Sequence, residues 1–256
     1  MSGSSNSPEK IVRAGLLIIG DEILSGRTQD TNLRSIADFL RPLGVRLAEA
    51  RVVADETDAI VMALNALRSA YDYVFTTGGI GPTHDDITID AVAQAFGLEV
   101  AEHPEAVRIL EAHYPTGEFT EARRRMTRAP IGARLIHNHA TLAPGFEIGN
   151  VFILAGVPMV MRAMLESLPG RMVGSAPTVT REYRAPGARE SAIAGPLAAL
   201  AKQYRALSFG SYPFFSSEGY GVYIVIRGTD PALVAAVSPD VQAIFQGLGV
   251  VPNLVE

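Results

Sequence analysis

Apolar residues fall into blocks along the first two thirds of the chain, and two patterns alternate between the blocks. Residues 12–19 and 73–77 are short apolar runs, typical of buried strands in a parallel sheet, and residues 45–53 form another strand candidate. Between them, apolar side chains recur at helical spacing over residues 33–43 and 60–67. This alternation predicts an α/β fold with right-handed crossovers and a doubly wound, mostly parallel sheet.

Shorter blocks continue the pattern as far as residue 168. One helix is predicted to end near Gly97, and another to begin at Pro104. Residues 118–128 look helical and contain the basic triplet 123–125. The remaining elements expected here are a strand at 134–136, a loop at 140–146, a strand at 151–154, and a helix from Pro158 with a methionine-rich core face.

A change of pattern near residues 169–177, rich in proline, glycine and serine, marks a domain boundary. Beyond it, the expected elements are strands at 178–184, 207–214 and 221–227 and helices at 190–204 and 231–246. We therefore expect a disordered tail over residues 1–10, an α/β domain over 11–174 and a small α+β domain over 175–256.

Composition excludes several classes of protein. With 48% hydrophobic and 19% charged residues among 256, the chain is an ordinary globular protein, and zero cysteines exclude disulfides, thiolate metal sites and a cysteine nucleophile. No apolar run approaches the roughly 18 to 20 residues that span a bilayer, and the first ten residues lack a signal-peptide core. We expect a cytoplasmic protein without a membrane partner. The net charge of −5, and the six basic and six acidic side chains beyond residue 174, argue against nucleic acid as a partner.

The stretch most suggestive of chemistry is residues 72–90. A buried strand runs into Gly78, Gly79 and Gly81, and two aspartates then precede a helix. A glycine turn after a strand, at the carboxyl edge of a parallel sheet, is where ligands bind in open α/β folds. The alternative is purely structural, because glycines form tight turns and acidic residues cap helices.

A phosphate or pyrophosphate is the ligand that such a loop favours. Glycines allow a close approach to main-chain N–H groups, and a helix N-terminus attracts anions. Carboxylates beside a phosphate would repel it unless a divalent cation lay between them. The carboxylates of Asp21, Glu22, Asp85 and Asp86 are therefore candidate metal ligands, or a base directed at the bond to be cleaved.

Four motifs carry a resemblance to a known family: Thr76-Thr-Gly-Gly-Ile-Gly-Pro-Thr-His-Asp-Asp86, Gly20-Asp-Glu-Ile-Leu-Ser-Gly-Arg-Thr-Gln-Asp-Thr-Asn32, Ala143-Pro-Gly-Phe146 and Leu154-Ala-Gly-Val-Pro158. The first resembles the glycine signature of the molybdopterin-binding MoaB/Mog family, and the others resemble motifs of its CinA branch. The resemblance implies a MoaB/Mog-like sheet followed by a KH-like α+β domain. The amidase domain that ends full-length CinA proteins has no counterpart in this sequence, so its activity is not carried over.

The CinA branch resembles enzymes that split ADP-ribose into AMP and ribose 5-phosphate with a divalent metal ion. The wider family implies a second possibility, molybdopterin binding in molybdenum cofactor biosynthesis. A third is a non-catalytic nucleotide-binding relative. The implied partners are ADP-ribose or molybdopterin, and a second copy of the chain in a homodimer or homotrimer.

Site residues follow from the motifs together with the resemblance. The catalytic candidates are Asp86, Asp72 and Asp85, and the metal candidates are Asp21 and Asp86. The substrate-binding candidates are Gly20, Glu22, Ser25, Asn32, Thr77, Gly78, Gly79, Gly81, Pro82, Thr83, Pro144, Gly145, Phe146, Gly156 and Pro158.

Two departures from the family pattern favour the non-catalytic alternative. Ala155 stands where the family usually has proline, and Thr141 stands where it has glycine, a change that could crowd a ligand. His84 is a possible proton carrier, although a turn histidine is more often simply exposed. The arginine triplet is most simply a solvated surface, and the alternative is that one or two of its members bind a ligand phosphate.

Overall fold

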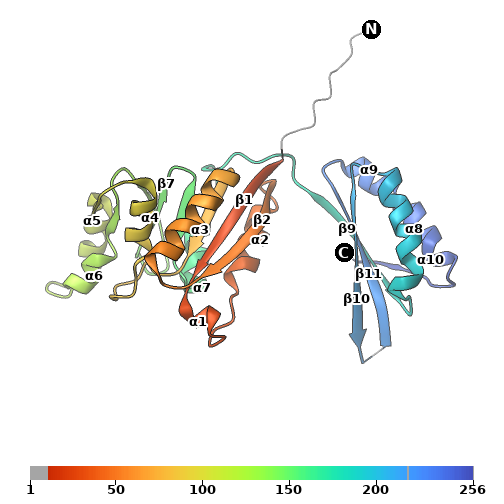
Figure 1. Ribbon diagram of the computed structural model, residues 1–256, viewed down its shortest axis with the longest axis horizontal. Coiled ribbons are helices and arrows are strands. Elements are labelled where there is room, and N and C mark those ends of the chain that lie inside the picture. Colours follow the sequence, from red (N-terminus) through yellow and green to blue (C-terminus); the bar gives the residue numbers. More distant parts are fainter. Residues whose placement is uncertain (1–10, 218, 256) are drawn as a thin grey trace, which may run out of the picture. The chain divides into compact units, whose positions relative to one another are not determined.

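The computed structural model describes residues 11–217 and 219–255, which form two compact units. The first unit extends to Ser175 and the second begins at Ala176, one residue after the expected boundary (Figure 1). The tail expected over residues 1–10 lies outside the described residues. Each unit has its own hydrophobic core and is described by itself.

The first unit is built on a mixed, mostly parallel sheet with the strand order β2-β1-β3-β8-β7-β6. Its neighbours β2, β1, β3 and β8 are parallel, whereas β7 runs antiparallel to both β8 and β6. This order confirms the doubly wound α/β class. The strands of the unit are β1 (Val12–Ile19), β2 (Val45–Val53), β3 (Tyr73–Thr77), β4 (Val100–Glu102), β5 (Arg128–Pro130), β6 (Arg134–Ile136), β7 (Gly145–Ile148) and β8 (Val151–Leu154).

Helices cover both faces of this sheet. Side chains of α3, α4 and α5 share one core with Leu17 and Ile19 of β1, and side chains of α2 and α7 share another with Leu16 and Ile18 (Figure 1). Successive residues of a strand point to opposite faces, so a continuous apolar run fits a sheet covered on both sides. The helices are α1 (Asp21–Leu24), α2 (Asn32–Leu40), α3 (Thr57–Ala70), α4 (Thr88–Phe96), α5 (Pro104–His113), α6 (Glu121–Arg125) and α7 (Pro158–Leu165).

The helix expected over residues 118–128 is mostly wrong. Helix α6 has only five residues, and β5 then pairs antiparallel with β4 in a separate small sheet. The N–H of His103 donates to Thr127 O (2.8 Å), which draws the chain away from the helix. The loop expected at 140–146 is also too long, because β7 begins at Gly145.

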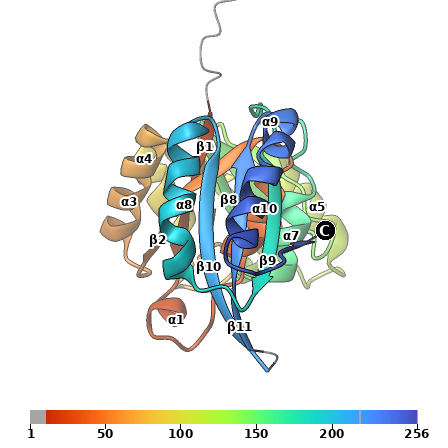
Figure 2. The same ribbon diagram turned by 90° about the vertical axis from the view of Figure 1, so that its right-hand side faces the viewer.

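The second unit is an antiparallel sheet with the order β10-β11-β9-β12 (Figure 2). Its elements are β9 (Val179–Pro186), α8 (Glu190–Gln203), β10 (Ser208–Ser216), β11 (Gly219–Gly228), α9 (Pro231–Ala236), α10 (Ser238–Gln246) and β12 (Asn253–Val255). The helices share a core with alternate residues of β11, Val222, Ile224 and Ile226. The small α+β unit is thus confirmed, but the helix expected over 231–246 is interrupted at Val237.

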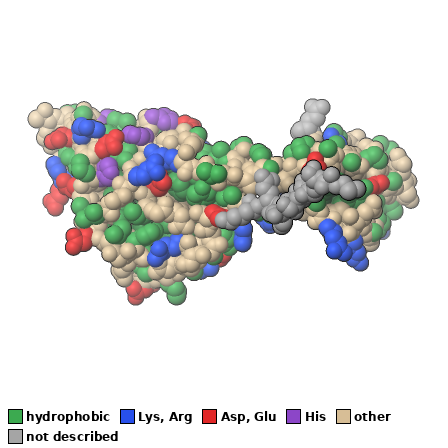
Figure 3. Space-filling model, turned by 90° about the horizontal axis from the view of Figure 1, so that it is seen from above, with side chains coloured by type: hydrophobic (Ala, Val, Ile, Leu, Met, Phe, Trp, Pro, Cys, Tyr) green, Lys and Arg blue, Asp and Glu red, His purple; other side chains and the backbone are tan. Residues whose placement is uncertain are grey.

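The surface of the first unit is mixed in character. Acidic, basic and apolar side chains are interspersed over the face that Figure 3 shows. Exposed apolar side chains such as Met62 and Met159 are ordinary on a protein surface when they stand singly. Across residues 11–217 and 219–255, no helix has the length and apolar character needed to cross a membrane.

Candidate functional site

The carboxyl ends of the parallel strands bring the predicted motifs to one edge of the sheet. The glycine loop, residues 78–86, follows β3 at this edge, and its Gly78 N–H donates to Leu154 O at the end of β8 (3.2 Å). Gly78 has φ +103°, and a Cβ there would lie 2.1 Å from Ile19 O at the end of β1. Only glycine fits this position, because a side chain would collide with the neighbouring strand.

The next residues of the loop are fixed from the start of α4. The hydroxyl of Thr88 donates to Gly78 O (2.9 Å), and its N–H donates to Gly79 O (3.0 Å). A Cβ on Gly79 would lie 2.3 Å from the Thr88 hydroxyl oxygen. A Cβ on Gly156, after β8, would come within 3.1 Å of Gly78 Cα. The loop therefore runs in close contact with the main chain and side chains on either side.

Asp86 shapes the loop instead of capping the helix. Helix α4 begins at Thr88 and has no side-chain cap, so neither aspartate caps this helix. Asp86 Oδ2 accepts hydrogen bonds from the N–H (2.8 Å) and hydroxyl (2.5 Å) of Thr83. Gly81 passes close to this carboxylate, since a Cβ there would lie 2.7 Å from Asp86 Oδ2.

A second group of carboxylates gathers around Asp55, directly after β2. Asp55 Oδ2 accepts a hydrogen bond from the N–H of Asp21 at the start of α1 (2.9 Å). Burial raises the pKa of Asp55, and the charges of Asp21, Glu22 and Asp85 raise it further, whereas the hydrogen bond from Asp21 lowers it. Repulsion among these acids is the electrostatic situation that a bound cation relieves.

Asp55 is the site residue that sequence reasoning missed. The signal was present, because an acidic residue follows the strand predicted at 45–53, as Asp21 follows the strand at 12–19. Among the residues that the structure describes, no three acidic, histidine or cysteine side chains are grouped so that they could hold a metal ion by themselves. A metal at this edge would need further oxygen ligands from a bound molecule or water.

Two buried side chains at the carboxyl edge have polar atoms without a partner among the described residues. Asn32, 5% exposed, donates its Nδ2 to Gly156 O (2.7 Å), yet its Oδ1 accepts nothing. The hydroxyl of Thr77, which ends β3, is also unpaired, as is that of its neighbour Thr76. Unsatisfied buried polar groups are uncommon in proteins, and a catalytic role, a bound water or a bound ion commonly explains them.

A model of the probable molybdopterin-binding domain matches residues 15–172, which contain the whole edge just described. The chain belongs to the molybdopterin-binding domain family. A second model, the middle domain of FAD synthase, matches residues 185–253 in the antiparallel unit. The second unit is thus similar to part of FAD synthase and not to an amidase.

The relatives place the chain in the CinA branch of the family. A CinA-like protein of Citrifermentans bemidjiense is 41% identical over 194 residues, which cover 72% of this chain and 46% of that protein. The crystal structure of CinA from Thermoplasma acidophilum, a protein of unknown function, has a TM-score of 0.57 at 34% identity, covering 61% of this chain and 95% of that one.

Another relative matches almost the whole chain. A protein of Metallosphaera sedula is 30% identical over 253 residues, covering 92% of this chain and 95% of its own length. The CinA-like protein of C. bemidjiense, by contrast, is matched over about half of its length. Both segments of the chain therefore match the sequence of a protein of similar length.

The loop at residues 138–146, where Thr141 departs from the expected family pattern, is held by hydrogen bonds within the loop. Asn138, 3% exposed, donates its Nδ2 to the Thr141 hydroxyl (2.7 Å) and to Ala143 O (2.9 Å), and its Oδ1 accepts the N–H of Ala140 (2.9 Å). Leu142 has φ +61°, a conformation unusual for a side chain of its kind. Thr141 is therefore hydrogen-bonded within the loop.

One predicted catalytic residue lies at the opposite end of β3 from the glycine loop. Asp72 precedes β3, whereas the glycine loop follows it, and five residues at about 3.3 Å each separate the two by roughly 17 Å. Asp72 Oδ2 accepts the N–H of Arg13 near the start of β1 (2.9 Å). The structure thus places Asp72 at the end of β3 opposite the glycine loop, and its catalytic role, which was inferred from the family resemblance, stays a prediction.

Some of the other predicted residues lie in the segments at the carboxyl ends of the strands, and the rest lie in neighbouring turns and helices. Ser25 donates its hydroxyl to Glu22 O (3.3 Å), which closes the turn after α1, and Pro158 begins α7. The side chain of His84 is 98% exposed, as expected for a turn histidine. The positions that lie in the strand-end segments themselves are Gly20, Thr77, Pro82, Pro144, Gly145, Phe146 and Gly156.

Proposed function

We propose that the chain is a metal-dependent nucleotide pyrophosphohydrolase that cleaves ADP-ribose or a related dinucleotide. The observation that carries the proposal is the meeting of two features at one edge of the sheet: a main-chain loop suited to phosphate, and the carboxylates around Asp55. Either feature could occur without the other in a protein. A pyrophosphate bound together with a cation, however, requires both a phosphate-binding loop and carboxylates. The unpaired Oδ1 of Asn32 and hydroxyl of Thr77 support a ligand at the same edge.

The donor set fits a divalent metal ion. Asp21 and Asp86 are the ligands predicted from sequence, and Asp55, which accepts the N–H of Asp21, is a further candidate. One or two of these carboxylates would hold the ion, together with oxygens of the substrate and water. Magnesium is commonly held by one or two carboxylates together with substrate phosphates and water. When bound, such an ion polarises a phosphoryl oxygen and lowers the pKa of a bound water.

The chain's own residues would bind and orient the substrate. Main-chain N–H groups around Gly79 and Gly81 would hold one phosphate of the pyrophosphate group. A carboxylate, Asp86 or Asp85, would accept a proton from water as its oxygen attacks phosphorus. The P–O bond of the pyrophosphate then breaks, giving AMP and ribose 5-phosphate from ADP-ribose.

The test is incubation with ADP-ribose and a series of divalent cations, with AMP release followed by chromatography. FAD should be tested alongside ADP-ribose, because it contains a pyrophosphate and because residues 185–253 match a domain of FAD synthase. We expect AMP release that requires a metal and stops on addition of chelator. Absence of release from every dinucleotide, with every cation, would overturn the proposal.

Asp55→Asn is expected to raise the cation concentration needed for half-maximal AMP release by about 10- to 100-fold. Asparagine still accepts the N–H of Asp21, so the start of α1 is retained while one negative charge is lost. The matched control is Asp58→Asn, an exposed acidic residue in the first turn of α3. A metal requirement equal to that of the wild-type protein would exclude Asp55 from the metal site.

Molybdopterin binding is the second candidate, and the match of residues 15–172 to the molybdopterin-binding domain favours it. The same loop would then hold the phosphate of the pterin instead of a pyrophosphate. A strain that lacks this protein would lose the activity of its molybdenum enzymes. Normal activity of those enzymes in the deletion strain would count against this role.

A further inference from the structure

The arginines at positions 123–125 and 128, which follow α5, differ from one another in whether they have ion-pair partners. Arg123 contacts Glu118 (3.3 Å), Arg124 contacts Glu102 (2.8 Å) and Arg128 makes a two-pronged contact with Asp90 (2.6 and 3.1 Å). Arg123 and Arg124 also lie over the rings of Tyr114 and Phe119. These contacts account for three arginines as surface ion pairs, the simpler of the two alternatives raised by the sequence.

Arg125 is different, because the described part of the chain offers its guanidinium no hydrogen-bond acceptor or acidic partner. Its Nε is buried and unpaired. Leaving a buried donor of a charged group unsatisfied is costly, more so than for a neutral group. An acceptor supplied by a bound molecule would satisfy it.

Arg125 also lies between two hollows. It lines a small cavity together with Gly81 and Asp86, the residues of the glycine loop. It further lines an open groove of about 440 Å³ along β4 and α6, with Arg124 and Arg128. The guanidinium therefore links the glycine loop to a space large enough for part of a nucleotide.

The charged side chains of the groove differ in whether they have partners. Glu102 is neutralised by Arg124, and Arg128 is paired with Asp90, so neither pair contributes a net charge. The remaining lining charges are Arg125 and Glu121, and Glu121 is exposed. Arg125 is thus the cation of the groove that has no partner, and its planar fork of N–H groups suits the oxygens of a phosphate.

We propose that Arg125 binds a phosphate of the ligand other than the one held by the glycine loop, so that the site takes a molecule with two linked phosphates. This inference rests on the proposed function for the position of the first phosphate. The part of the ligand beyond the second phosphate lies in the groove along β4 and α6. Arg125 is a binding residue here, and the carboxylates keep the chemical role.

The experiment measures binding of ADP-ribose and of inorganic pyrophosphate by calorimetry, with magnesium present, and also KM and kcat for AMP release. Arg125→Gln should weaken binding of both compounds and raise KM by about 10- to 100-fold, with kcat changed much less. Arg125→Lys keeps the positive charge and loses the planar fork of N–H groups. Its affinity and KM should lie between those of the wild-type protein and those of Arg125→Gln. Arg123→Gln is the matched control, because Arg123 lines neither hollow and should behave like the wild-type protein.

The outcomes separate this inference from the proposed function. Wild-type affinity and KM in Arg125→Gln, with an unchanged melting temperature, would overturn the role of Arg125 and leave the hydrolase intact. Loss of binding in Arg125→Gln, with no AMP release by the wild-type protein, would support the role of Arg125 and overturn the hydrolase. A wild-type protein that binds neither compound would overturn both.

Discussion

Replacing Asp86 by alanine is expected to lower kcat for ADP-ribose hydrolysis by about 10²- to 10⁴-fold, the range over which a positioned acid or base accelerates a reaction. The carboxylate lines the cavity beside Gly81 and holds both the N–H and the hydroxyl of Thr83. Its removal takes away a proton acceptor and a support of the loop at once. Initial rates of AMP release at saturating substrate and metal measure the effect.

Thr83→Val separates these two roles of Asp86. Valine keeps the main-chain N–H that donates to Asp86 Oδ2 and removes only the hydroxyl, so the carboxylate remains. We expect this variant to keep most of the activity that Asp86→Ala loses. Equal losses in the two variants would mean that the hydroxyl contact, and not the carboxylate as a base, carries the effect. Full activity of Asp86→Ala would remove Asp86 from the mechanism.

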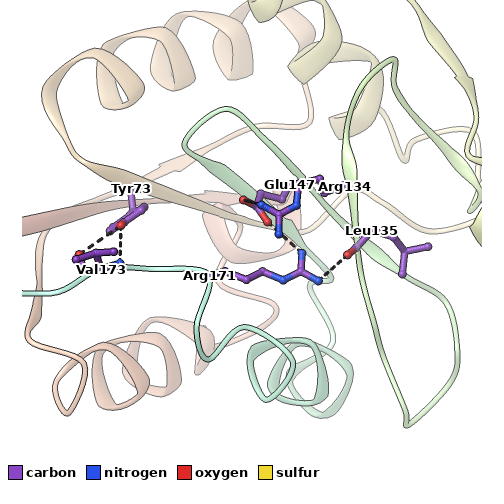
Figure 4. Close-up of polar contacts among 6 residues, drawn as sticks. All are labelled: Tyr73, Arg134, Leu135, Glu147, Arg171 and Val173. Atoms are coloured by element: carbon purple, nitrogen blue, oxygen red, sulfur yellow. Dashed lines mark hydrogen bonds and ion pairs between the residues drawn. The ribbon is translucent and has the colours of Figure 1, made fainter.

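Arg171→Met is expected to lower the free energy of unfolding by about 3–5 kcal/mol, because it leaves a buried carboxylate with only the exposed Arg134 as a basic partner. The side chain of Glu147 on β7 is 9% exposed, and that of Arg171 is 17% exposed. Arg171 donates to Glu147 (3.0 Å) and to Leu135 O on β6 (2.9 Å), and so fastens the segment after α7 to the sheet (Figure 4). Nearby, Val173 N–H donates to the Tyr73 hydroxyl (2.8 Å).

Arg134→Gln is the control for this prediction. Arg134 contacts the same glutamate at 3.4 Å, but its side chain is 66% exposed, so its loss should change stability by less than about 1 kcal/mol. Scanning calorimetry is the suitable measurement, since the chain lacks tryptophan and has two compact units. The transition of the first unit should move and that of the second should not. Equal shifts for the two variants would contradict a special role of Arg171.

The parts of the fold that were predictable are those with long or repeated patterns. The run at 12–19 and the spacing of Ile60, Leu64 and Leu67 identify β1 and α3, because burial on a sheet imposes their periodicity. Strands β4 and β5 have three residues each, too few to show a period. Their pairing depends on residues about 28 apart that meet only in the folded chain.

The site was predictable as far as it is local in sequence. The three glycines and two aspartates of the glycine loop lie within nine residues, so a motif contains them. Asp55 joins through a neighbouring strand, and its proximity to Asp21 depends on the register of β1 and β2. The pairing of the arginines was equally hidden, since the partners Glu102 and Asp90 lie 22 and 38 residues away.

The close fit of Gly78 between the ends of β1 and β8 has a thermodynamic consequence for any ligand. A loop already held on both sides has few alternative conformations to give up when a phosphate arrives, so little conformational entropy is lost there. The groove beside α6 is formed by short elements and long side chains, where rotamers must be fixed on binding. The loop should therefore bind the phosphate with little loss of conformational entropy. Selectivity for the rest of the molecule should depend on how well that part of the ligand compensates for fixing the side chains of the groove.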